Sequence, residues 1–317
     1  MRRRSFGLLA GSLAIPRLAV AAWPDRPISV IVPFPPGGNN DIMARLLAPV
    51  VERSIGQPLV IDNRGGGGGT IGAGQAARAA PDGNTLLFAD ISILAIAPHL
   101  FPQLPYGDDS FAPVVRLTEV SLLVGVSKDS SYSSVADLVA AARARPDAVT
   151  FATPGNGTAG HLASQLLASL SGTKMTHVPF RGSAPAATEL AAGRVDMLID
   201  GTLLPAVQQG QIRALAVTGP SRSPFAPGIP TVAESGVTGY AFLSWHGVAA
   251  PRGTPPEIVA RLNSAFNAAL RDEAIQARAR QLGLPLKGGT PEEFAVFIAS
   301  ERAKMGPLVR DSGARVE

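Results

Sequence analysis

Short apolar runs alternate with amphipathic helical patterns along most of the chain, and this alternation limits the possible folds more than any other feature. Ile28–Val32 is rich in β-branched residues, as buried strands are, and Ile42 and Leu46 then fall on one face of a helix. Repetition of this pair is typical of βα units and predicts an α/β fold with largely parallel sheets. We expect strands at 28–32, 58–62, 85–89, 122–126, 149–152, 174–178, 195–199, 213–217 and 241–249, and helices at 41–55, 70–80, 134–145, 158–171, 183–192, 255–270, 272–282 and 291–304.

The first 22 residues have the pattern of an export signal. Arg2–Arg4 are basic, residues 6–15 are apolar, and Ala19–Ala21 is a small-residue cleavage motif. The order Arg3-Arg4-Ser5-Phe6 also resembles a twin-arginine signal. The apolar stretch is shorter than the ~20 residues that span a bilayer, so a membrane anchor is the weaker alternative. We therefore expect residues 1–22 to be a signal peptide that is removed on export.

The charge balance argues against a charged macromolecular partner. The whole sequence has 28 Lys and Arg against 24 Asp and Glu, but four of the basic residues lie in the first 22 residues and no acidic one does. The rest of the chain is therefore balanced, which argues against binding to nucleic acid or to an anionic membrane. The sequence contains no cysteine, and its four histidines show no metal-ligand spacing. We therefore expect neither a metal site nor a cofactor.

The expected elements divide into two blocks that the chain connects twice. Residues 114–127 lead into a middle block, and residues 244–252 lead out of it. We expect lobe 1 at 23–123 and 247–317, and lobe 2 at 124–246. Two connections between α/β lobes make a hinge with a cleft, and ligands of open α/β sheets bind at the carboxyl ends of strands. The loops that follow the strands should therefore face this cleft.

The loop Pro33–Asp41 follows the first strand and is the first candidate binding loop. Prolines stiffen it, and glycines let a ligand approach backbone N–H groups at the start of the next helix. Free N–H groups and the positive end of the helix dipole favour an anion. The alternative is a plain Pro/Gly turn in which Asn40 or Asp41 caps the helix. The expected ligand contacts in this loop are Phe34, Pro36, Gly37, Gly38 and Asn39.

The loop Thr153–His161 repeats this arrangement in lobe 2, and Pro179–Ser183 is another strand end that turns into a helix. A histidine one turn into a helix, as His161 is, is more typical of packing than of acid–base catalysis. Arg181 either pairs with a carboxylate or is a solvated side chain at a helix start. The expected contacts in lobe 2 are Thr153, Gly155, Asn156, Gly157, Thr158, His161, Phe180, Arg181, Gly182, Ser183 and Asp200, and lobe 1 adds Ser92.

Five consecutive glycines, 65–69, leave two interpretations open. The spacing Gly67-x-Gly69-x-x-Gly72 after a strand matches a dinucleotide-binding fingerprint, and Asp90 lies at about the right distance for a ribose contact. A polar insertion before the glycines argues against this and favours a flexible loop that lines the cleft. An exported dinucleotide-dependent enzyme therefore stays as an alternative. No local catalytic signature occurs in the sequence, so we expect no catalytic residues and no enzyme.

A set of ordered motifs identifies a family that the chain resembles. They are Trp23–Ile28, Val32–Gly38, Gly56–Pro58, Asp62–Arg64, Pro81–Leu87, Leu104–Tyr106, His177–Gly182, Leu215–Thr218, Pro230–Gly236 and Ala250–Pro255. With these motifs, the chain resembles Bug-type periplasmic substrate-binding proteins of the tripartite tricarboxylate transporter (TctC-like) family. The resemblance runs over essentially the whole length after the first 22 residues.

This resemblance implies two lobes that close like a flytrap on a small carboxylate, such as an organic acid, an aromatic acid or an acidic amino acid. It also implies a periplasmic monomer that passes its ligand to a membrane permease of the tripartite tricarboxylate type. Sensing through a receptor is the alternative role. Family members hold the ligand carboxylate through two loops and ordered waters, and those loops correspond to 34–39 and 179–183 here.

Two positions depart from the family pattern. Phe180-Arg181 replaces the commoner Tyr-Lys, and Trp245-His246 replaces Trp-Tyr. Loss of a tyrosine hydroxyl and gain of a guanidinium should change which acid fits. If the ligand is an amino acid, Asp200 or Asp90 is expected to accept hydrogen bonds from its ammonium group.

Overall fold

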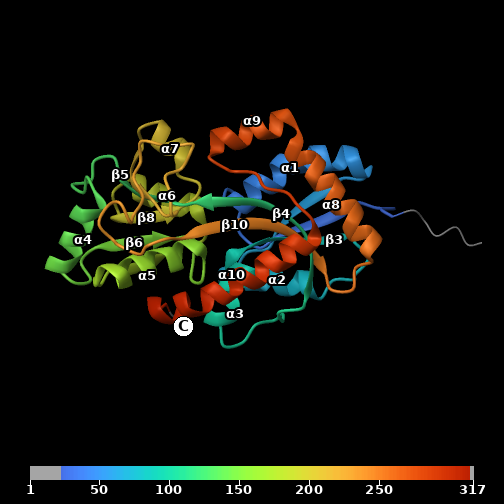
Figure 1. The fold of residues 1–317 in the computed structure, drawn as a ribbon, viewed down its shortest axis with the longest axis horizontal. Helices are drawn as coiled ribbons and strands as arrows, with labels where there is room; N and C mark the ends of the chain where they lie inside the picture. The colour runs from blue at the N-terminus through green and yellow to red at the C-terminus, as the bar shows by residue number, and fades with distance from the viewer. Residues whose placement is uncertain (1–22, 315–317) are drawn as a thin grey trace, which may run out of the picture.

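Two five-stranded sheets, each covered by helices, lie next to each other and form the two lobes of the protein (Figure 1). The computed structural model describes residues 23–314, so the expected signal at 1–22 lies outside the described residues. The first sheet has the order β2-β1-β3-β10-β4 and consists of β1 (Ile28–Val32), β2 (Leu59–Asn63), β3 (Thr85–Asp90), β4 (Phe111–Ser121) and β10 (Leu243–Pro251). The second has the order β7-β6-β8-β5-β9 and consists of β5 (Leu123–Ser127), β6 (Thr150–Thr153), β7 (Thr176–Pro179), β8 (Met197–Asp200) and β9 (Ile212–Val217). The predicted two-lobed α/β fold is confirmed.

Helices fill most connections between the strands. The first lobe carries α1 (Asn39–Ile55), α2 (Thr70–Ala77), α3 (Ala97–Leu100), α8 (Pro256–Arg271), α9 (Glu273–Leu282) and α10 (Pro291–Ser312), and the second carries α4 (Val135–Ala144), α5 (Ala159–Ser171), α6 (Ser183–Ala191) and α7 (Leu204–Gln208). α10 begins with a capping box in which the side chains of Thr290 and Glu293 accept from each other's backbone N–H. The far end of α10 packs against α5 of the second lobe, where Ser169 donates to the Asp311 carbonyl at 2.9 Å.

In each sheet four strands run in one direction and one strand runs against its neighbours. β1 is parallel to β2 and β3, whereas β10 is antiparallel to β3 and β4. The second sheet repeats this pattern, with β6 parallel to β7 and β8, and β5 antiparallel to β8 and β9. The reversed strands, β5 and β10, are the two that arrive from the other lobe. The prediction of largely parallel sheets is wrong for them, because the path of the chain between the lobes sets their direction.

The chain crosses between the two sheets twice. Leu122 alone joins β4 to β5, and residues 218–242 join β9 to β10. Hydrogen bonds tie the crossings together, since the Leu122 N–H donates to Thr218 Oγ1 at 2.8 Å and the Thr218 N–H donates to the Leu122 carbonyl at 2.9 Å. The expected exit at 244–252 is wrong, because β10 pairs with β4 from its first residue, Leu243. The second connection between the sheets therefore ends at residue 242, just before Leu243, and not at His246.

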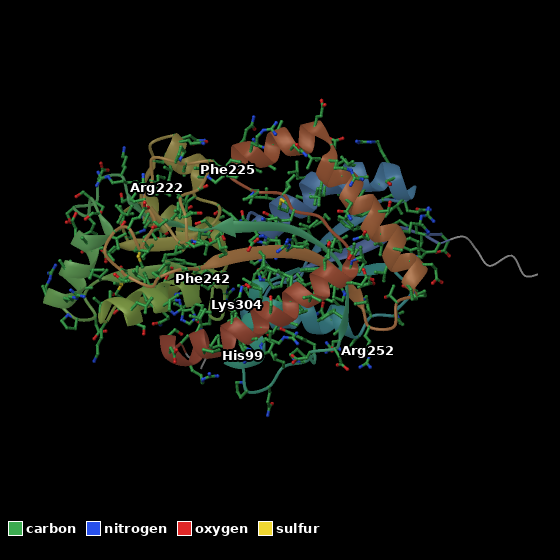
Figure 2. All side chains as sticks on the ribbon, viewed as in Figure 1. His99, Arg222, Phe225, Phe242, Arg252 and Lys304 are labelled. Atoms are coloured by element: carbon green, nitrogen blue, oxygen red, sulfur yellow. The ribbon has the colours of Figure 1, made fainter. Side chains whose placement is uncertain are left out.

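Apolar side chains pack between each sheet and its helices, and most charged side chains lie at the surface. Trp245 is fully buried and packs edge-on against Phe294 and Phe297 of α10. Arg222 and Arg252 are exposed and lie on opposite sides of the molecule, at the upper left and the lower right of Figure 2. A search of residues 23–314 finds no helix that is long and apolar enough to cross a membrane.

Candidate functional site

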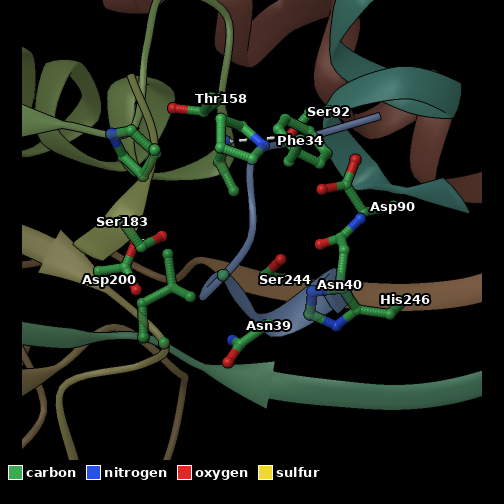
Figure 3. Close-up of a pocket in the computed structure, with 18 residues that line it drawn as sticks. Phe34, Asn39, Asn40, Asp90, Ser92, Thr158, Ser183, Asp200, Ser244 and His246 are labelled. Atoms are coloured by element: carbon green, nitrogen blue, oxygen red, sulfur yellow. Dashed lines mark hydrogen bonds between the residues drawn. The ribbon is translucent and has the colours of Figure 1, made fainter. Parts of the chain in front are cut away.

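A cavity lies between the lobes, at the carboxyl ends of β1, β3, β6 and β8 (Figure 3). Its volume is about 60 Å³, room for roughly four to six waters, so it suits a small molecule. The cavity is lined from the first lobe by Phe34, Pro35, Gly38, Asn39, Asn40, Asp90, Ser92, Ser244 and His246, and from the connection between the lobes by Leu122. The second lobe contributes Pro154, Thr158, Ala159, Gly160, Gly182, Ser183, Asp200 and Gly201.

The N-terminus of α1 reaches the cavity without a side-chain cap. Gly38 is the N-cap residue, and no side chain of the described chain bonds to the first N–H groups of α1. These groups have no partner inside the helix either. Of the two caps considered from the sequence, Asp41 instead accepts the Gly37 N–H at 3.1 Å, and it also holds Arg45 and Asn63. Asp41 therefore fixes the loop while the start of the helix stays open toward the cavity.

The N-terminus of α5 is bonded by residues from both lobes. Thr158 is its N-cap residue and accepts the His161 N–H at 3.4 Å. The Ala159 N–H donates to Ser92 Oγ at 3.1 Å, across the cavity from the first lobe (Figure 3). Because Ser92 and Ala159 belong to helices of different lobes, this hydrogen bond forms only when the lobes are close together.

The N-terminus of α6 is the third helix start in the cavity wall. Gly182 is its N-cap residue, with a φ of +108°, and no side chain of the described residues caps it. A Cβ atom at Gly182 would lie 3.4 Å from Pro35 of the other lobe, so a side chain here would press against the opposite wall. Ser183, the first residue of α6, donates its hydroxyl to Asp200 Oδ2 at 2.9 Å.

These three helix starts make the cavity favourable for an anion although no lysine or arginine is among the described residues that line it. Each helix places a partial positive charge and free N–H groups at its N-terminus. α1, α5 and α6 are 17, 13 and 9 residues long, which is long enough for their dipoles to act. The site can therefore hold an ionised group through oriented backbone donors and hydroxyls.

Two buried carboxyl groups face each other across this cavity, and their hydrogen bonding differs. Asp200 ends β8 and accepts three hydrogen bonds, from the Ser183 hydroxyl and from the N–H and hydroxyl of Thr202. Asp90 ends β3, and its Oδ1 accepts the Ile93 N–H at 3.2 Å. Oδ2 of Asp90 accepts no hydrogen bond of normal geometry from the residues that the structure describes. Burial raises the pKa of both groups, that of Asp90 to about 7, although contacts with Ile93, Asn40 and Ser92 oppose the rise.

His246 lies beside Asp90, because the two residues are directly paired between β10 and β3. Its ring makes no hydrogen bond to the rest of the described chain, and its Nδ1 is buried. Burial lowers the pKa of His246 to about 4, so the ring is neutral around pH 7. Ser244 lines the cavity from the same face of β10, two residues earlier. Trp245, between them, points into the core, as alternation along a strand requires.

The residues expected from the sequence fall into three groups. Phe34, Gly38, Asn39, Ser92, Thr158, Gly182, Ser183 and Asp200 line the cavity. Gly155, Asn156, Phe180 and Arg181, together with the five-glycine run, line a larger outer pocket of about 680 Å³ that shares Phe34, Pro35, Pro154 and Gly182 with the cavity. Pro36, Gly37, Thr153, Gly157 and His161 line neither.

Two of the residues outside both pockets hold the loop of the second lobe in shape. His161 is buried, its Nδ1 accepts the Gly157 N–H at 3.2 Å, and its ring stacks on His177 at 4.3 Å. Thr153 Oγ1 lies 2.6 Å from His177 Nε2 and accepts the Gly155 N–H. Burial lowers the pKa of His161 to about 3, with a smaller contribution from His177, so this pair is neutral at pH 7. The packing interpretation of His161 agrees with this geometry.

The site expected from the sequence lacked several polar residues that the structure brings in. Asn40 and Ser244 were not among its expected contacts, Asp90 was considered only as an alternative, and His246 was noted only as a departure from the family pattern. Two signals point to them. Asp90 ends a strand, where the carboxyl-end rule places ligands. Ser244 and His246 alternate along a strand whose other face carries a buried tryptophan.

The dinucleotide fingerprint has a different role in the structure. The glycine run follows β2, which is the edge strand of its sheet, whereas a dinucleotide site is built on the first strand beside the point where the strand order reverses. A Cβ atom at Gly68 would collide with the backbone carbonyl of Asn156 in the second lobe. The glycines therefore allow the two lobes to approach each other at the outer pocket.

Comparisons with known proteins agree with this geometry. A sequence model described as the tripartite tricarboxylate transporter family receptor matches residues 43–314. The protein BugT of Bordetella pertussis is 38% identical over 300 residues, which is 93% of this chain and 92% of BugT. Both the matched span and this identity extend over both lobes.

Solved structures with the same fold include two similar proteins. The R. palustris protein Rpa4515, solved with adipate, has a TM-score of 0.89 and 37% identity, and the match covers 93% of this chain and 100% of that one. The periplasmic binding protein BugD has a TM-score of 0.88 and 32% identity, with the same coverage. The chain therefore belongs to the receptor family of the tripartite tricarboxylate transporters, a family of periplasmic solute-binding receptors and not of enzymes.

Proposed function

We propose that this protein captures a small carboxylate in the cavity between its lobes and delivers it to a membrane permease of the tripartite tricarboxylate type. In this proposal residues 1–22 direct export to the periplasm, and the mature protein works as a monomer. Residues 23–121 and those from Leu243 onward move as one lobe against 123–217. The observation that carries the proposal is the meeting of three helix N-termini in a cavity lined, in the described chain, by no lysine or arginine.

A carboxylate suits this arrangement better than a neutral ligand does. The open N–H groups at the starts of α1 and α6 need acceptors, and an ionised oxygen is the strongest acceptor they can meet. Each helix dipole typically contributes about 0.3–1 kcal/mol to a nearby anion, and more where the site is buried. The adipate in the similar R. palustris structure is a ligand of this class.

The carboxylate should sit between the two loops that the sequence singled out. In the first lobe we propose contacts from Phe34, Gly38 and Asn39, and in the second from Thr158, Gly182 and Ser183, all of which line the cavity. The residues of the outer pocket, including the exposed Arg181, would meet the ligand only on entry. Water molecules would bridge to donors that the ligand does not reach.

Thermal denaturation of the purified mature protein with a panel of acids tests this function. Mono-, di- and tricarboxylates, aromatic acids and acidic amino acids form the panel, and the neutral amides of the same acids are the matched controls. An acid at about a hundred times its dissociation constant adds about 2.7 kcal/mol to the stability of the folded state. We expect a concentration-dependent rise in melting temperature with at least one acid and not with its amide. A rise with sugars alone, or with no acid in the panel, would rule the proposal out.

A further inference from the structure

Asp90 has acceptor capacity that the rest of the described protein uses only in part, since Oδ1 accepts the Ile93 N–H and Asn40 and Ser92 add only weaker contacts. It is 5% exposed, it lines the cavity, and only its Oδ1 accepts a hydrogen bond of normal geometry among the described residues. Asp200, the corresponding residue of the other lobe, has both oxygens occupied by Ser183 and Thr202. An ionised carboxylate is costly to bury unless it is paired, so Asp90 needs a partner that Asp200 does not need.

The groups packed around Asp90 supply no positive partner. His246 on β10 is neutral around pH 7, and Asn40 of α1 is an uncharged amide. Behind Asp90, the Tyr106 hydroxyl is already bonded to the Ile93 carbonyl at 3.0 Å. The nearest cation from α10, Arg302, is paired with Asp108 at 3.0 Å and donates to the Leu94 carbonyl. β1 contributes no charged residue to this side of the sheet.

The polar groups of the cavity are also divided between two sides. The uncapped helix start at Gly182 offers backbone N–H donors for an anion. Asp90 and the neutral His246 offer acceptors, and Figure 3 shows them on the side of the cavity away from Ser183 and Asp200. A ligand with a negative group and a positive group fits this division, whereas a purely anionic ligand would place a second negative charge near Asp90.

We infer that the ligand is an amino acid, whose carboxylate binds at the helix N-termini and whose ammonium group donates to Asp90. This inference rests on the proposed capture of carboxylates and adds the chemical class of the ligand. An ammonium beside Asp90 favours the ionised form of the carboxyl and so offsets the effect of burial on its pKa. Ser244 and His246 line the cavity from the same face of β10 and offer acceptors for the remaining ammonium hydrogens.

Calorimetric titration with matched pairs of ligands tests this inference. The pairs are L-aspartate and succinate, L-glutamate and glutarate, L-leucine and isocaproate, and L-phenylalanine and hydrocinnamate. Within each pair the two acids differ only by the ammonium group. A hydrogen bond between charged groups discriminates by about tenfold to a hundredfold. We therefore expect the amino acid of at least one pair to bind at least ten times more tightly than its deaminated partner at pH 8.

Two isosteric variants show which carboxyl group is responsible. Asp90→Asn keeps the shape of the side chain and removes its charge, so the preference for the amino acid should fall to about twofold or less. Asp200→Asn is the matched control, since it removes a charge from the opposite wall of the same cavity. It should change the affinity for both members of a pair by a similar factor and leave the preference intact.

The pH dependence gives a second readout that does not depend on a variant. The ligand-free pKa of Asp90 is about 7, so the ionised fraction rises roughly tenfold between pH 6 and pH 8. Amino-acid affinity should rise by about the same factor in the wild type and stay flat in Asp90→Asn. A protonated Asp90 that donates to the second carboxylate of a diacid would instead make diacid affinity fall over that range.

The possible outcomes separate this inference from the proposed function. Equal or tighter binding of the deaminated acids, or a preference that survives Asp90→Asn, overturns the amino-acid assignment while carboxylate capture stands. Diacid affinity that falls with rising pH overturns it in the same way. Failure of every acid in the pairs and in the thermal panel overturns both.

Discussion

The third strand in the order of each sheet, β3 in the first lobe and β8 in the second, ends in a buried aspartate at the cavity. In the second lobe, Asp200 is surrounded by donors from its own lobe and cannot accept much more. In the first lobe, Asp90 accepts one hydrogen bond of normal geometry, from Ile93, and only weaker contacts from Asn40 and Ser92. The same fold position is therefore used for internal structure in one lobe and is available to a ligand in the other.

The helix starts differ between the lobes in a related way. α1 begins at an uncapped glycine, so its N–H groups are open to the cavity. α5 begins at Thr158, which caps it, and Ser92 from the first lobe takes a further N–H. The first lobe thus offers groups that a ligand can use, and one start in the second lobe is used to hold the lobes together. A similar arrangement of strands and helices in the two lobes therefore does not determine which polar groups bond within the protein and which stay open to a ligand.

The largest loss of stability should follow from replacing Asp200, whose hydrogen bonds all lie within its own lobe. Asp200→Ala leaves the Ser183 and Thr202 hydroxyls and one backbone N–H without their acceptor. We expect the free energy of unfolding to fall by about 2–4 kcal/mol, since an unsatisfied buried donor costs about 1–3 kcal/mol. Urea denaturation of the ligand-free protein measures this loss.

Asp90→Asn is the contrasting variant in the other lobe. The pKa of Asp90 is raised by burial from 3.8 to about 7, so this carboxyl stabilises the fold below about pH 4 and loses that contribution as the pH rises through 7. The melting temperature of Asp90→Asn relative to the wild type should therefore increase from pH 5 to pH 8. Similar losses of stability in the two variants at pH 8 would contradict the different use of the two aspartates.

A smaller effect should follow when the open loop of the first lobe gains a side chain. Gly37 has a φ of +92°, and a Cβ atom there would lie 3.4 Å from Ala184 of α6 in the other lobe. Gly37→Val should keep the lobes from closing and weaken ligand binding by about tenfold or more, with a loss of stability of about 1–3 kcal/mol from backbone strain. Calorimetric titration with whichever acid raises the melting temperature most measures the change in affinity.

Gly56 gives a matched control for that variant. It follows α1 with a φ of +87°, and nothing lies within 4 Å of its Cβ position. Gly56→Val should lose stability by a similar amount and bind the acid normally. If both valine variants bind equally well, the Gly37 loop does not take part in closure.

The smallest effect concerns the hydrogen bond between the lobes. Ser92→Ala removes the acceptor of the Ala159 N–H, and this bond exists only when the lobes are close. Affinity should fall about twofold to tenfold, as expected for about 0.5–1.5 kcal/mol. Ser164→Ala is the control, because among the described residues the Ser164 hydroxyl bonds only to the Gly160 carbonyl, within α5. Equal affinities in the two alanine variants would show that Ser92 does not stabilise the closed form.

Local sequence patterns predicted most elements, and β4 shows where they fail. Arg116, Thr118 and Glu119 interrupt the apolar run of this strand, so it does not look like a buried strand. Their partners come from distant segments. Arg116 lies over the Phe297 ring at 4.1 Å, and Lys287 pairs with Glu119 at 3.3 Å. A pattern that depends on such partners cannot be recognised from neighbouring residues alone.

The candidate site was predictable to a similar degree. The carboxyl-end rule correctly directed attention to the loops that contain Gly38 and Ser183, which line the cavity. It could not separate residues that face a ligand from residues that hold their own loop, as Thr153 and His161 do. It also missed Ser244, because the direction and neighbours of β10 follow from how the two lobes are joined.

The paired hydrogen bonds between Leu122 and Thr218 affect how the lobes open and when a ligand can leave. They hold the two crossing segments side by side, so a bend in one is accompanied by a bend in the other. We expect the lobes to part by rotation about a single axis through this pair, in the microsecond to millisecond range typical of domain motion. A ligand in so small a cavity leaves only when such a rotation occurs. The residence time of the ligand then depends on how often the lobes open and on how many openings pass without release. An encounter with the membrane partner delivers the ligand only if it coincides with an opening or causes one.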